Sequence, residues 1–101
     1  MRALDASHDG ATITLAAGEP IELRLAENPT TGFRWRVERA SACRIIADAF
    51  EPGPKLAGAG GTRVWRIAAD GDADLALAYA RPWGGSPVAR FAVRLRIAAS
   101  R

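Results

Sequence analysis

The stretch IELRLAENPTTGFRWRV, residues 21–37, alternates apolar and polar side chains on both sides of a turn. The apolar positions are Ile21, Leu23 and Leu25 before the turn, and Phe33, Trp35 and Val37 after it. A period of two places alternate side chains on opposite faces of a β-strand. Each half is therefore predicted to be a strand with one buried face, Ile21–Leu25 before the turn and Phe33–Glu38 after it.

The turn itself is Asn28-Pro29-Thr30-Thr31-Gly32-Phe33. Pro29 fixes its own φ and disfavours the α region for Asn28, and Gly32 can adopt a positive φ without strain. Thr30 and Thr31 are β-branched and stiff at χ1. A rigid, exposed tip loses little entropy when it docks. The segment is therefore either a binding loop or only a hairpin turn.

The same alternation continues along the chain and predicts about seven short strands. Their ranges are 11–17, 21–25, 33–38, 45–51, 62–69, 73–81 and 90–98. Residues 39–44 are predicted to be a short connection, and Asp70-Gly71-Asp72 a turn. No segment has a helical period. The sequence predicts a single all-β domain, residues 1–101, with an immunoglobulin-like antiparallel β-sandwich fold.

Three connections in this scheme are long or unusual in composition: 28–33, 53–61 and 82–89. Successive strands of an antiparallel sandwich reverse direction, so every second connection emerges at the same end. These three connections are therefore predicted to gather at one pole. Their clustering favours a binding edge over three unrelated turns.

Tryptophan occurs three times, in two kinds of context. Trp35 and Trp65 fall on the inward faces of predicted strands and are expected in the core. Trp83 lies between Pro82 and Gly84, outside the alternating pattern. It is predicted to be an exposed interface anchor, and the alternative is a ring folded back over the end of the sandwich.

Composition excludes several functional classes. A hydrophobic content of 49% and a charged content of 25% are typical of a soluble globular protein. The net charge of +3 is spread along the chain, and no basic run with interleaved aromatics indicates nucleic acid. No apolar run predicts a membrane span or a signal peptide. A soluble chain is expected, either cytoplasmic or exported after removal of a leader.

Side chains suited to catalysis or metal binding are scarce. His8 is the only histidine and Cys43 the only cysteine, so neither a zinc site nor an internal disulfide is expected. The glycine-rich run 58–61 has no helix after it, which argues against a phosphate loop. No cofactor and no enzymatic activity are predicted. Two interpretations of these residues stay open. Either Cys43 or His8 serves a small enzyme, or Cys43 is only a buried thiol and His8 only a solvated histidine in a turn.

Three segments together resemble the loop signatures of chagasin-type inhibitors of papain-like cysteine proteases. They are Asn28-Pro29-Thr30-Thr31-Gly32-Phe33, Gly58-Ala59-Gly60-Gly61-Thr62 and Arg81-Pro82-Trp83. Each motif alone is weak, but all three in this order and at similar spacing are specific. The resemblance runs from about His8 to Ile97. One departure is Ala57 after Leu56, where the family pattern has a second leucine.

The resemblance implies a reversible, competitive protein inhibitor. Thr30 would lie closest to the catalytic cysteine of the protease, with Thr31 beside it. Leu56 and the 58–62 segment would line one side of the cleft, and Arg81-Pro82-Trp83 would clasp the other. The expected partner is papain or a cathepsin-like enzyme, bound by a monomer. The alternative is a non-inhibitory immunoglobulin-like binding or adhesion module.

Overall fold

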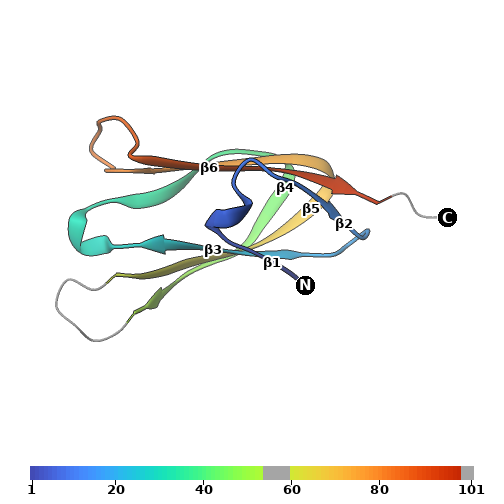
Figure 1. Ribbon diagram of the computed structural model, residues 1–101, viewed down its shortest axis with the longest axis horizontal. Helices are drawn as coiled ribbons and strands as arrows, with labels where there is room; N and C mark the ends of the chain where they lie inside the picture. Colours follow the sequence, from blue (N-terminus) through green and yellow to red (C-terminus); the bar gives the residue numbers. More distant parts are fainter. Residues whose placement is uncertain (54–59, 99–101) are drawn as a thin grey trace.

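A computed structural model describes residues 1–53 and 60–98 of the chain (Figure 1). The strands are β1 (Arg2–Leu4), β2 (Thr12–Leu15), β3 (Ile21–Glu27), β4 (Arg34–Pro52), β5 (Gly61–Ala80) and β6 (Ala89–Ile97). Two single turns of 3₁₀ helix, η1 (Ala6–His8) and η2 (Pro29–Thr31), accompany them. The fold is therefore all-β. In the described part of the chain, no helix has the length and apolarity needed to cross a membrane.

The sheet curls around the long strand β5. Residues 61–67 of β5 pair with β3, while residues 73–79 pair with β6. Strand β4 runs antiparallel to both halves of β5, from Arg34 opposite Ala80 to Pro52 opposite Gly61. β1 adds to β3, and β2 adds to β6, both in parallel register. The two halves face one another, as Figure 1 shows.

The division into seven short antiparallel strands differs from this structure. The predicted strands 33–38 and 45–51 are parts of β4, and 62–69 and 73–81 are parts of β5. The predicted connection 39–44 and the predicted turn at 70–72 both continue their strands. Three irregularities in the β4–β5 pairing explain the difference. β4 has one extra residue after Val37 and one after Ile45, whereas β5 has four residues, 70–73, opposite Ala42 alone. A bulge bends a strand without ending its pairing. The parallel pairing of β1 and β2 was also not predicted.

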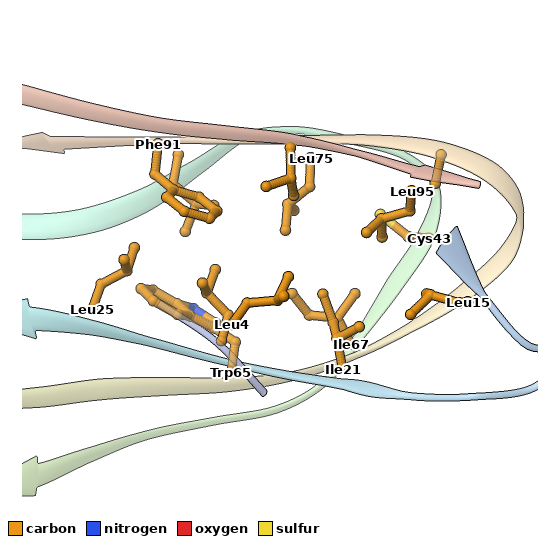
Figure 2. Close-up of a cluster of buried hydrophobic side chains, with 14 residues drawn as sticks. Leu4, Leu15, Ile21, Leu25, Cys43, Trp65, Ile67, Leu75, Phe91 and Leu95 are labelled. Atoms are coloured by element: carbon orange, nitrogen blue, oxygen red, sulfur yellow. The ribbon is translucent and has the colours of Figure 1, made fainter. Parts of the chain in front are cut away.

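Apolar side chains from the two halves of the sheet meet between them (Figure 2). Trp65 and Ile67 are buried, as are Phe91, Val93 and Leu95, which confirms the inward faces predicted for these segments. The remaining larger members are Leu4, Leu15, Ile21, Leu23, Leu25, Leu75 and Leu77. Removal of this apolar area from water is the main force that holds the layers together.

The inward face predicted for residues 33–37 is only partly covered. Trp35 is half-buried and packs against the core, whereas Val37 stays 38% exposed. Val37 lies opposite the buried Leu77. Because β4 pairs with β5 alone among the described strands, no further strand covers this edge.

Candidate functional site

The segment 28–33 forms a capped, internally bonded turn. Oδ1 of Asn28 accepts hydrogen bonds from the backbone N–H of Thr30 at 3.2 Å and from its hydroxyl at 2.6 Å. The hydroxyl of Thr31 donates to the carbonyl of Asn28 at 2.8 Å. Gly32 ends the turn with φ +81°, and its N–H bonds the carbonyl of Pro29. These hydrogen bonds join the residues of the tip to one another, and the side chains of Thr30 and Thr31 are exposed.

Side chains from the neighbouring strands hold the root of this turn. The N–H of Trp35 donates to Oε2 of Glu27, and its indole Nε1 donates to the carbonyl of Ala26, both at 2.8 Å. The N–H of Asn28 donates to the hydroxyl of Tyr79 at 2.9 Å. The ring of Tyr79 stacks on that of Trp35 with a centroid separation of 4.9 Å. The two ends of the turn are therefore tied to each other and to β5.

The segment after β5 packs directly on this turn. Trp83 is 74% exposed, which confirms its predicted exposure. Its ring lies over Gly32, where a Cβ atom would stand 2.6 Å from Cη2 of the indole. The guanidinium carbon of Arg81 lies 4.5 Å from the ring centroid of Phe33 and 6.0 Å from that of Trp83. Cation–π attraction therefore adds to the contact between the segments.

The start of β5 approaches the same turn from the other side. A Cβ atom on Gly60 would lie 2.9 Å from the carbonyl oxygen of Glu27 and 3.1 Å from Cβ of Asn28. Gly61 is paired with both Glu27 and Pro52, so Gly61 and Thr62 belong to a strand and not to a loop. The backbones meet this closely because glycine has no side chain.

The structure thus brings the described parts of all three predicted segments to one end of the molecule. These parts are 28–33, 60–62 and 81–83, and they lie toward the left of the view in Figure 1. For these described residues, the prediction that the three connections share a pole is confirmed. Leu56, Gly58 and Ala59, also predicted as site residues, lie outside the described residues.

Comparison with known proteins agrees with this geometry. The model of the Chagasin family peptidase inhibitor I42 matches residues 14–95. The chain belongs to the chagasin family. Chagasin from Trypanosoma cruzi is 41% identical, over 78% of this chain and 80% of that protein. Amoebiasin-1 from Entamoeba histolytica is 35% identical, over 79% of this chain and 82% of that protein.

A solved structure extends the similarity to the fold. The crystal structure of the cysteine protease inhibitor EhICP2 from Entamoeba histolytica superposes with a TM-score of 0.84. The match covers 96% of this chain and 95% of that chain, with 25% sequence identity. The chagasin family consists of protease inhibitors and not of enzymes, as predicted from the sequence.

In this chagasin-family chain, Cys43 and His8 have structural roles. Cys43 is buried in the core, as predicted. Burial raises the pKa of its thiol, and the nearby carboxylates of Asp70 and Asp74 raise it further. A raised pKa disfavours the thiolate that a nucleophile requires. His8 accepts a hydrogen bond from the N–H of Asp5 and closes the cap of η1.

A buried carboxylate that was not predicted lies beside the 28–33 turn. Glu27 is 2% exposed, and its Oε1 accepts a hydrogen bond from Nη1 of Arg63 at 3.2 Å. The signal was present, because Glu27 continues the period-two series after Leu25 and so falls on the buried face. An acidic residue next to a predicted turn is usually exposed, so the predicted strand ends at Leu25, whereas β3 extends to Glu27.

Proposed function

We propose that this protein is a reversible, competitive inhibitor of papain-like cysteine proteases, with the 28–33 turn entering the catalytic cleft. The convergence of three segments supports this proposal most strongly, because Trp83 packs on Gly32 and Gly60 packs on Asn28. A protease cleft is a slot, and a narrow, preorganised projection fits a slot at low entropic cost. The relatives named chagasin and EhICP2, the latter described as a cysteine protease inhibitor, point the same way.

The chemistry of the tip suits blocking without reaction. The hydroxyls of Thr30 and Thr31 both donate within the turn. The carbonyls of Asn28 and Pro29 accept hydrogen bonds from Thr31 and Gly32, in a 3₁₀ turn. A substrate, in contrast, must place a peptide carbonyl in line with the nucleophile. In the proposed complex Thr30 lies closest to the catalytic cysteine, with Thr31 beside it.

The flanking segments supply the rest of the proposed contact. Arg81, Pro82 and Trp83 clasp one side of the cleft, with Trp83 as the aromatic anchor. Leu56 and residues 58–62 line the other side. Together the three segments bury about 800 Å² on each partner, the usual size for protease–inhibitor complexes.

We propose further that residues 1–101 act as one monomeric inhibitor domain. In this view the two facing halves of the curled sheet correspond to an immunoglobulin-like sandwich. The long strands β4 and β5 each contribute to both layers and count twice, so β2 to β6 correspond to the seven predicted strands, and the short β1 is additional.

Titration of papain with the purified protein tests this function. We expect competitive inhibition at nanomolar concentrations and a one-to-one complex in gel filtration. Absence of inhibition at micromolar protein contradicts the proposal. If the protein inhibits neither papain nor a cathepsin-like enzyme, the result favours the alternative that it is a non-inhibitory binding module.

A further inference from the structure

The side chain of Glu27 stands between two of the converging segments. It is the last residue of β3, directly before the 28–33 turn, and its side chain is fully buried. Oε2 accepts the hydrogen bond from the N–H of Trp35, just after the turn, at 2.8 Å. Oε1 accepts from Nη1 of Arg63 on β5 at 3.2 Å. One carboxylate thus contacts both the far root of the turn and the strand that follows Gly60.

Arg63 carries this connection on to β4. Its Nη2 donates to Oδ2 of Asp48 at 2.8 Å, and its Nε donates to Oδ1 of the same carboxylate. The chain Glu27–Arg63–Asp48, called here the charged bridge, therefore spans β3, β5 and β4. These are the strands that lead into the first turn and into and out of the second connection.

The charge on Glu27 is not needed to close the turn. A neutral glutamine at this position would still offer an oxygen to the N–H of Trp35. Removal of one partner from a buried ion pair leaves the other charge without compensation, so the two residues act as a unit. What the charge adds is the strong interaction with Arg63. The charge on Glu27 therefore serves to couple the 28–33 turn to the start of β5, and it is not required for the hydrogen bond that closes the turn.

Gly60 and Gly61 lie next to the charged bridge, where β5 starts. Gly60 lies so close to the turn that an added Cβ atom would stand 2.9 Å from the carbonyl oxygen of Glu27 and 3.1 Å from Cβ of Asn28, and this approach is made by the glycine backbone. Arg63 lies only three residues beyond Gly60, and it anchors the strand start to Glu27. We propose that Glu27 is a positioning residue: through the charged bridge it fixes the spacing between the 28–33 turn and the start of β5 for binding. This inference rests on the proposed function.

The test compares Glu27→Gln and Arg63→Gln with the unchanged protein against papain. Each variant is expected to raise the inhibition constant about tenfold, and the double variant is expected to add little beyond either single change, because one coupling is lost. The matched control is Arg44→Gln, which breaks the 3.0 Å Arg44–Asp70 ion pair at the bend of the long strands. Its inhibition constant is expected to stay unchanged.

A second readout separates this inference from the proposed function. Backbone ¹⁵N relaxation of Thr30, Thr31 and Gly32 is expected to show greater mobility in Glu27→Gln than in the unchanged protein. The mobility comparison can be made even if the unchanged protein does not inhibit papain. In that case the proposed function fails, while the effect of Glu27 on the turn is still tested. A lower melting temperature with unchanged turn mobility and an unchanged inhibition constant would overturn the positioning role.

If Glu27→Gln does not fold, Asp48→Asn replaces it, because Asp48 lies at the exposed end of the bridge. This variant keeps the buried pair of Glu27 and Arg63 and removes only the charge that orients the guanidinium. It is expected to increase the mobility of Thr30 and Thr31 and to weaken inhibition about threefold. Unchanged values of both would overturn the proposal.

Discussion

The indole of Trp83 lies so close to Gly32 that a Cβ atom at position 32 would stand 2.6 Å from Cη2 of the ring. Gly32 also has φ +81°, a conformation that side-chain-bearing residues rarely adopt. Two separate constraints thus act on one residue, one from the local turn and one from a segment fifty positions away. The contact makes the first and third segments a single surface.

Gly32→Ala is expected to weaken inhibition at least tenfold, because the methyl group displaces Trp83 from its position over the turn. Gly18→Ala is the matched control, since Gly18 has φ +77° and no atom within 4 Å of an added Cβ. Both variants should lose about 1–2 kcal/mol of unfolding free energy from the left-handed backbone alone. Inhibition constants and urea unfolding measured on both variants check this. Equal inhibition by the two would refute the role of the contact.

Trp83→Ala is expected to speed dissociation from papain on the order of 30-fold, as for an aromatic hot spot worth about 2 kcal/mol. The melting temperature should barely change, because the ring is mostly exposed in the free protein. Surface plasmon resonance gives the dissociation rate and calorimetry the melting temperature. An unchanged dissociation rate would remove Trp83 from the binding surface.

Tyr79→Phe is expected to lower the unfolding free energy by about 1 kcal/mol, because the N–H of Asn28 loses its acceptor. The ring stacking with Trp35 is retained, so the core remains packed. Amide hydrogen exchange of Asn28 should be faster in the variant than in the unchanged protein. Identical exchange would show that the phenol oxygen does not hold the root of the turn.

Stability is expected to fall at alkaline pH because of Cys43. Folding raises the pKa of this thiol above its ordinary value of 9.0, so the unfolded chain loses the proton first as pH rises. The stabilisation is complete below pH 9.0 and is lost progressively from there up to the folded-state pKa. Urea unfolding at pH 8 and about pH 10 should show a larger decrease in the unchanged protein than in Cys43→Ala. Equal decreases would contradict the burial effect.

The sequence predicts the buried faces, and the end at which the described parts of the three segments gather, for a physical reason. Alternation of side chains is a local property, and it identifies the inward positions of β3, β5 and β6 without any knowledge of pairing. Trp83 departs from the alternation between a proline and a glycine, and this local anomaly marks it as exposed. The gathering of three connections then follows from the reversal of successive strands.

Strand continuity and the edge pairings are less accessible from sequence. Asp70, Gly71 and Asp72 have the composition of a turn, yet here they lie in the bent middle of β5. Residues 70–73 of β5 are extra residues opposite Ala42 of β4, and whether a strand bends or ends at such a place depends on partners that are distant in sequence. The parallel neighbours of β1 and β2 are non-local for the same reason. Alternation places Glu27 on the buried face, but it does not reveal the partner Arg63, which lies 36 positions away.

The proposed mode of inhibition is tested most directly by a disulfide trap at the turn. A Thr30→Cys variant in the Cys43→Ala background is prepared as a mixed disulfide with thionitrobenzoate and added to papain, with Gly18→Cys as the control. If Thr30 faces the catalytic cysteine, the papain thiolate displaces one equivalent of thionitrobenzoate rapidly and becomes linked to position 30. Release no faster from Thr30→Cys than from Gly18→Cys would contradict insertion of this turn into the cleft.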